Sequence, residues 1–255
     1  MIGGAVAAAI FIGVIGCLRL GRLIGTRAMQ RTGAELAPSV GSLETAVFAL
    51  LGLLIAFTFS GALQRFDGRR VQVVDEANSM NNAWSYIDLL PPAAQPKLRD
   101  TFRAYVDARI ATYRALPDIE NAKSALVLSK QLQNEIWEQA VAAARQKDAN
   151  PAVTIVLAPE LQNLFSIANA RVAATHIHPP TVIYVMLAIL ALVAAFLAGY
   201  QSAGERGYDW IHKTAFAGIV AVTVYVILDI EYPRLGFVRI DAIDKVIVDV
   251  RAGMK

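Results

Sequence analysis

Cysteine and histidine are scarce in this chain, which has one cysteine and three histidines among 255 residues. A single cysteine, Cys17, excludes a disulfide within the chain and gives no information on the redox compartment. His176 and His178 are separated by about 200° around a helix, so they cannot bind one metal ion from the same helical face. His212 stands apart from both in the sequence. We therefore expect no metal site and no cofactor.

Catalytic and nucleotide-binding signatures are also missing. With so few histidines and cysteines, no Ser-His-Asp or Cys-His arrangement is indicated. The glycines of Gly21-x-x-x-Gly25 lack the Lys and Ser/Thr that follow them in a phosphate-binding loop. Charged residues make up only 18% of the chain, and no basic arm with interleaved aromatic residues is present. The sequence thus argues against an enzyme and against a nucleic-acid-binding protein.

The chain does have four long apolar runs, two near each end of a charged middle part. Each has about the 17–25 residues that a helix needs to cross the hydrocarbon core of a bilayer. Runs this free of charge read as transmembrane helices, because lipid cannot satisfy an exposed backbone. We therefore predict an all-α membrane protein with four transmembrane helices. The apolar runs cover residues 1–18, 46–63, 180–200 and 214–230.

These runs suggest a division of the chain into four parts. A first transmembrane helix pair with a basic connecting loop covers residues 1–63, and a helical extramembrane module covers 64–178. A second transmembrane helix pair covers 179–232, and a short carboxy-terminal tail covers 233–255. The predicted fold is therefore a four-span membrane protein with a helical extramembrane bundle inserted between the second and third spans.

The extramembrane module is expected to contain three helices. Apolar residues recur there at spacings of three and four, and prolines interrupt the pattern. The predicted helices lie near 94–116, 119–147 and 152–178, with a kink at Pro159.

The second apolar run continues into the charged part without a helix-breaking signal. No proline falls between Glu44 and Leu90, and one apolar stripe keeps its helical phase from Ile55 to Ile87. This pattern predicts a single helix of about 45 residues, roughly 65 Å long, that crosses the membrane and enters the extramembrane module.

The opposite face of this helix allows two interpretations. It is either the solvent side of an amphipathic helix or the lining of a pore formed by several copies of the chain. In a pore, Phe57 would form an apolar constriction and the polar residues beyond it a wet vestibule. A ridge of small residues beside this face, Gly52, Ala56 and Ser60, would let neighbouring helices approach closely. The predicted pore-lining residues are Phe57, Gly61, Gln64, Gly68, Asp75, Asn78 and Asn82.

Basic residues near the first span bear on lipid contact and on topology. Four arginines follow this span and suit anionic lipid head groups. By the positive-inside rule they favour an external position for residues 64–178. The numbers of basic residues near the membrane are similar on its two sides, however, so this comparison does not decide the topology. The four lipid-facing candidates are Arg19, Arg22, Arg27 and Arg31.

Two carboxylates at the end of the fourth span form a candidate interfacial charge cluster. Asp229 and Glu231 stand where an ionisable group is costly unless it is paired or hydrated. Arg234, Arg65 and Arg69 are the expected partners. One interpretation gives Asp229 a role in ion entry, and the other gives the cluster a structural role as an interfacial salt bridge.

Several segments resemble the bacterial bestrophin-like domain family. They are Leu-Gly-Leu-Leu-Ile-Ala-Phe-Thr-Phe-Ser-Gly at 51–61, Arg-Phe-Asp at 65–67, Asp-Glu-Ala-Asn at 75–78, Asp-Leu-Leu-Pro at 88–91, Tyr-Val-Asp-Ala-Arg at 105–109, and Ile-Leu-Asp-Ile-Glu-Tyr-Pro-Arg-Leu-Gly at 227–236. The resemblance implies a pentamer whose second membrane helix lines a pore with an apolar neck. It also implies cytosolic termini, against the placement that the arginines favour. The acidic run with which bestrophins bind calcium is absent from this sequence.

The expected function is passive ion conduction across the inner (plasma) membrane by a homo-oligomer, with a pentamer implied by resemblance alone. The expected partners are the lipid bilayer, further copies of the chain and inorganic ions. The alternative is a non-conducting scaffold or sensor whose extramembrane helices bind a partner protein. Ion selectivity stays open, because an Asp75 ring would favour cations while Arg65, Arg69 and Arg70 would favour anions.

Overall fold

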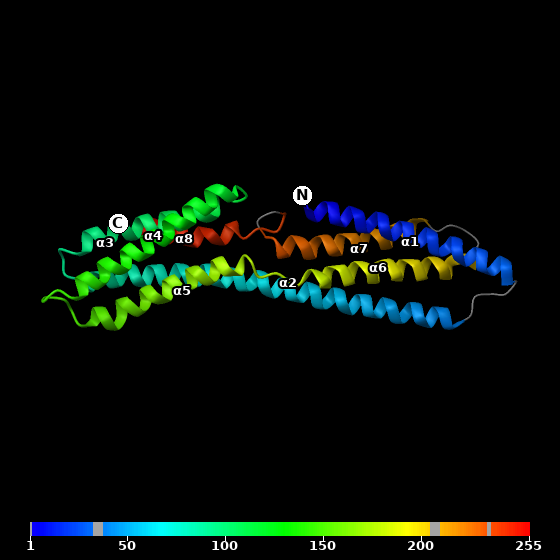
Figure 1. Ribbon diagram of the computed structural model, residues 1–255, viewed down its shortest axis with the longest axis horizontal. Helices are drawn as coiled ribbons and strands as arrows, with labels where there is room; N and C mark the ends of the chain where they lie inside the picture. Colours follow the sequence, from blue (N-terminus) through cyan, green and yellow to red (C-terminus); the bar gives the residue numbers. More distant parts are fainter. Residues whose placement is uncertain (1, 33–37, 205–209, 234–235) are drawn as a thin grey trace. The chain divides into compact units, whose positions relative to one another are not determined.

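The computed structural model describes residues 2–32, 38–204, 210–233 and 236–255 (Figure 1). Every regular element in these ranges is helical, which confirms the predicted all-α class. Four of the helices, α1, α2, α6 and α7, are long and apolar enough to cross a membrane. The helices are α1 (Ile2–Thr32), α2 (Pro38–Tyr86), α3 (Gln95–Arg114), α4 (Ile119–Ala144), α5 (Ala158–Ala174), α6 (Thr181–Gln201), α7 (Trp210–Glu231) and α8 (Asp241–Gly253).

The chain divides into two compact units. The first unit contains Met1–Phe66 and His178–Val238, and the second contains Asp67–Ile177 and Arg239–Lys255. Helix α2 contributes its first part to the first unit and its last part to the second.

Helix α2 confirms the prediction of one long helix. It runs without interruption for 49 residues, from Pro38 to Tyr86. Proline is tolerated at its first position, where no intrahelical donor is needed. Helix α2 ends at Tyr86 and is followed by a 3₁₀ turn, Ile87–Leu89. Pro91 explains why the helical segment stops here, because the residue before a proline disfavours helical dihedrals.

In the first unit, α1, α6, α7 and the first part of α2 run side by side (Figure 1). Glycines allow α1 and α6 to approach each other closely. A Cβ atom at Gly21 would lie 2.0 Å from the carbonyl oxygen of Phe196, and one at Gly199 would lie 2.1 Å from that of Leu18. Gly25 is also confined, because a Cβ atom there would lie 2.7 Å from the Tyr200 carbonyl oxygen. The Gly21-x-x-x-Gly25 spacing therefore serves helix packing.

The second unit contains the three predicted helices between α2 and α6, with bounds within a few residues of those expected. Just before the expected kink at Pro159, the chain forms a π-helical turn, Val153–Leu157. The tail, for which the sequence analysis named no element, forms α8. Arg251 fixes this helix to α3, since its Nε and Nη2 atoms donate to the two carboxylate oxygens of Asp107 at 2.8 and 2.9 Å.

Candidate functional site

The two faces of α2 differ sharply in burial. Its apolar stripe contains fully buried residues, such as Ala62 in the first unit and Val73 and Met80 in the second, all at most 1% exposed, while Phe59 at the same helical phase is 38% exposed. The predicted pore face points away from the rest of its own chain. Phe57 is 68% exposed, and Gln64, Gly68, Asp75, Asn78 and Asn82 are also exposed. Gly61 is half-buried beside the guanidinium group of Arg65.

The ridge of small residues on α2 makes no close contact within the part of the chain that the structure describes. Gly52, Ala56 and Ser60 are exposed, and a Cβ atom added at Gly52 would meet no other atom within 4 Å. The described part of the chain therefore leaves this ridge uncovered, as it does Gly4 and Gly16 of α1.

Glu231 is the centre of an ion cluster in the first unit. Its side chain is fully buried at the end of α7, and Arg65 of α2 approaches it through two nitrogens. Arg65 Nη2 and Nε lie 2.8 and 2.9 Å from Glu231 Oε2. His178 Nδ1 lies 3.0 Å from the other oxygen, and its ring packs against that of Tyr232 with the centroids 4.6 Å apart. The predicted pairing of Arg65 with this carboxylate cluster is therefore present.

The Asp229 side chain, near the end of α7, binds backbone N–H groups that follow this helix in the sequence. Its carboxylate accepts hydrogen bonds from the backbone N–H groups of Phe237 (3.1 Å) and Val238 (2.8 Å) and from the Tyr225 hydroxyl (3.3 Å). A Cβ atom at Gly236 would lie 1.4 Å from Asp229 Oδ1, so a larger residue there would displace this carboxylate. These contacts favour the structural interpretation of Asp229. They also show why an ionisable side chain is tolerated at this position.

Two further residues, Arg69 and Arg234, were predicted to join this charge cluster. Arg69 is part of the second unit, where its Nη2 atom donates to the Ile177 carbonyl oxygen at 3.3 Å. Arg234 lies outside the described residues. Of the arginines after the first apolar run, Arg22 is half-buried, and Arg19, Arg27 and Arg31 are exposed.

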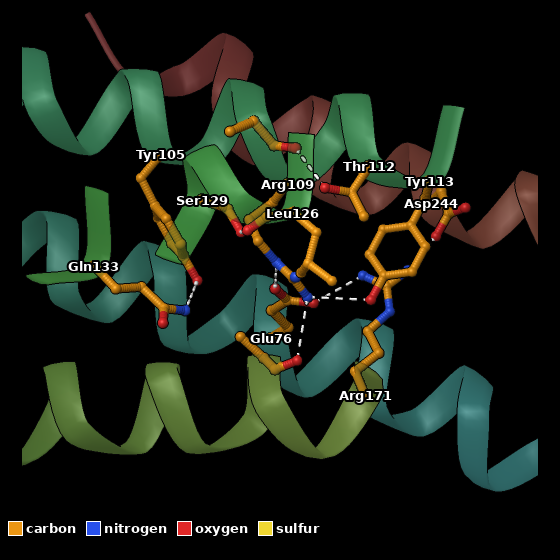
Figure 2. Close-up of polar contacts among 12 residues, drawn as sticks. Glu76, Tyr105, Arg109, Thr112, Tyr113, Leu126, Ser129, Gln133, Arg171 and Asp244 are labelled. Carbon is orange, nitrogen blue, oxygen red and sulfur yellow. Dashed lines mark hydrogen bonds and ion pairs between the residues drawn. The ribbon is translucent and has the colours of Figure 1, made fainter. Parts of the chain in front are cut away.

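The second unit contains a buried ion network that the sequence analysis did not predict (Figure 2). Glu76 of α2 lies between two arginines and is fully buried. Arg109 Nε of α3 lies 2.5 Å from Glu76 Oε1, and Arg171 Nη1 of α5 lies 2.7 Å from Glu76 Oε2. Arg171 Nη2 also reaches Asp244 Oδ1 of α8 at 2.5 Å. One network therefore joins four helices, with two positive and two negative side chains.

Two tyrosines complete the surroundings of this network. The Tyr113 hydroxyl accepts a hydrogen bond from Arg109 Nη2 at 3.2 Å, and the Arg171 guanidinium stacks over the Tyr113 ring at 3.8 Å. Gln133 donates to the Tyr105 hydroxyl at 3.3 Å (Figure 2). Burial raises the pKa of Tyr105, so this hydroxyl stays protonated.

The charge balance of the network fixes the state of Glu76, which follows the apolar run of α2 in the second unit. Burial by itself would raise the pKa of this carboxyl group. The adjacent guanidinium groups of Arg109 and Arg171 outweigh that effect and hold the pKa below its ordinary value of 4.5. A signal for this site exists in the sequence, because Glu76 is spaced three residues from Val73 and four from Met80 on the apolar stripe.

Within the described ranges, no group of three His, Cys, Asp or Glu side chains is placed to hold a metal ion. The structure instead has two charged clusters, around Glu231 and Glu76, whose members pair within the chain. It also has one exposed face of α2, which includes Phe57.

The fold resembles three crystal structures over nearly its whole length. Two are variants, tryptophan-to-alanine and tyrosine-to-alanine, of a bacterial bestrophin homolog from Klebsiella pneumoniae. The first has a TM-score of 0.69 and 11% identity, and covers 96% of this chain and 98% of that one. The second has a TM-score of 0.68 and 11% identity, with 95% and 99% covered. The third, a proline-to-alanine variant described as a membrane protein, has a TM-score of 0.66 and 12% identity, with 96% and 98% covered.

Among curated protein sequences, none is significantly similar to this chain. The sequence profile of the bestrophin-like domain matches residues 8–243. This match covers most of the chain and includes most of α1 and all of α2, α6 and α7. The chain therefore belongs to the bestrophin-like domain family.

Proposed function

We propose that the protein is an oligomeric passive ion channel whose pore is lined by the exposed face of α2. The observation that supports this most strongly is the 68% exposure of Phe57, a large aromatic side chain on a helix whose other face is buried at Leu51, Thr58 and Ala62. An exposed aromatic side chain in an apolar span contacts either lipid or a second copy of the chain. The polar continuation of the same face favours the second arrangement.

The helical phase of α2 supports a common axis for these residues. At about 100° per residue, Phe57 and Asp75 fall on the same line along the helix, and Gln64 and Asn82 lie within about 20° of it. In the proposed ring, Phe57 forms the apolar neck and gates by dewetting, while Gln64, Gly68 and the residues beyond line the vestibule. Gly52, Ala56 and Ser60 then form the contact between neighbouring subunits.

The ion pairs along α2 favour cations over anions. Arg65 is neutralised by Glu231, and Arg70 Nη1 lies 3.2 Å from Asp67 Oδ1. Asp75, in contrast, is exposed and makes no ion pair with any residue that the structure describes. A ring of such carboxylates attracts cations. The proposed substrate is therefore an inorganic cation.

The proposed assembly places helices α3 to α5, which lie between α2 and α6 in the chain, outside the bilayer as a helical bundle. The arginines after the first apolar run favour an external position for this bundle in a multi-pass protein of the inner (plasma) membrane. Reporter fusions after Lys130 and at the carboxy terminus test this topology. A cytosolic signal from both fusions would contradict it.

Flux from purified protein in liposomes tests the proposed function. We expect wild-type protein to conduct potassium in preference to chloride, and Phe57→Ala to increase conduction because it widens the apolar neck. Phe59→Ala is the matched control, since Phe59 lies about 200° away around α2 and outside the proposed pore. If neither the wild type nor Phe57→Ala conducts, the protein is a scaffold or sensor and the pore is excluded.

A further inference from the structure

The second unit contains a small, partly enclosed cavity away from α2. It has a volume of about 140 Å³ and lies between the last turns of α4 and the π-helical turn that leads into α5. Its walls include Trp137 and Ala140 from α4, and Val153 and Leu157 from the π-helical turn. Arg145, the residue that ends α4, is also part of its lining.

The local sequence explains why this space is not filled. Helix α4 presents two alanines, Ala140 and Ala144, one turn apart on the cavity side. Opposite them, the Ala158 N–H donates to the carbonyl oxygen of Val153, five residues earlier, so the turn is wider than an α-helical turn. π-Helical turns of this kind occur frequently at functional sites. Small side chains on one wall and a widened turn on the other leave a gap of defined shape.

The chemistry of the cavity selects a class of ligand. Its walls are almost entirely apolar, and its volume is close to the roughly 150 Å³ of a protein cavity that accepts benzene. Arg145 is exposed, and the described part of the chain provides it with no ion pair or side-chain hydrogen bond. A guanidinium group in this position can receive a carboxylate through two parallel hydrogen bonds.

We propose that this cavity binds a small carboxylate with a compact apolar group, such as an aromatic acid. The apolar group lies between Trp137 and Leu157, and the carboxylate pairs with Arg145. This site is independent of the proposed pore, because its lining residues belong to α4, the following π-helical turn and the first residue of α5.

Ligand-observed fluorine NMR of the full-length protein with 4-fluorobenzoate tests the proposal. We expect saturable binding to the wild type and at least tenfold weaker binding to Arg145→Gln, which loses the charge. Ala144→Leu fills the cavity and should abolish binding. Ala142→Leu is the matched control, because Ala142 is exposed on the same helix and lies outside the cavity lining, so binding should be kept.

Three results would overturn the proposal. One is the absence of saturable binding to the wild type. Another is equal binding by the wild type and Ala144→Leu, with unfolding temperatures showing that both are folded. The third is equal binding of 4-fluorobenzyl alcohol, which has the same ring without the charge, since it would remove the role of Arg145. Failure here would leave potassium flux unaffected, so this proposal and the channel proposal fail separately.

Discussion

Glu76 and Arg109 form an ion pair with 2.5 Å between Oε1 and Nε, and neither side chain is more than 1% exposed. A buried carboxylate is costly unless its charge is balanced and its oxygens are hydrogen-bonded. Arg109 and Arg171 meet both conditions, one at each oxygen of Glu76. Glu76 therefore links α2 to α3 through Arg109 and to α5 through Arg171 within the second unit.

Glu76→Gln should destabilise the protein, because it leaves two buried guanidinium groups facing a neutral amide. Removal of one partner of a buried ion pair typically costs on the order of 3 kcal/mol. Thermal unfolding in detergent measures the change. Glu120→Gln is the control, because Glu120 pairs with Lys123 on the surface, where both side chains are more than half exposed. An equal effect of the two substitutions would contradict a structural role for the network.

The lowered pKa of the Glu76 carboxyl group predicts that the stability of the protein decreases in acid. Its pKa is lower in the folded protein than in the unfolded chain, so its contribution is fully present above about pH 4.5 and is lost as the pH falls through the lowered value. The unfolding temperatures of wild type and Glu76→Gln should therefore converge as the pH falls below the lowered pKa of Glu76. A constant difference down to the lowest pH at which the protein folds would show that Glu76 is not the titrating group.

Close packing of α1 on α6 predicts a contrast between two glycines of α1. Gly21→Ala would place a Cβ atom 2.0 Å from the Phe196 carbonyl oxygen, so the helices must separate, and we expect a lower unfolding temperature. Gly16→Ala meets no atom within 4 Å and should be neutral or slightly stabilising, since alanine favours the helix. Similar unfolding temperatures for the two variants would mean that α1 and α6 are not packed at these glycines.

Asp75 should determine charge selectivity in the proposed channel. Asp75→Asn removes the unpaired carboxylate and should reduce the permeability of potassium relative to chloride, measured from the reversal potential in planar bilayers. Asp67→Asn is a matched control on the same helix, because Asp67 already pairs with Arg70. Unchanged selectivity in Asp75→Asn would remove Asp75 from the ion path.

The sequence predicted the helices because their signals are local. Apolar length, proline positions and the unbroken phase of α2 are properties of neighbouring residues, and they predicted where the helices lie, although α1 continues to Thr32 through the segment expected as a basic connecting loop. The Glu76 network could not be predicted in full because its members are brought together from 76 to 244 by tertiary packing. The backbone partners of Asp229 were also missed, since their N–H groups are carried by every residue except proline and leave no signal in the sequence.

The central claim is that Phe57 faces a conducting pore, and thiol modification tests it most directly. The chain has a single cysteine, so Cys17→Ser gives a background into which one cysteine is introduced at a time. In liposomes, a membrane-impermeant, charged thiol reagent should reduce potassium flux through Phe57→Cys and leave flux through Phe59→Cys unchanged. If the reagent leaves Phe57→Cys unaffected, or blocks both variants equally, α2 does not line a pore with this face.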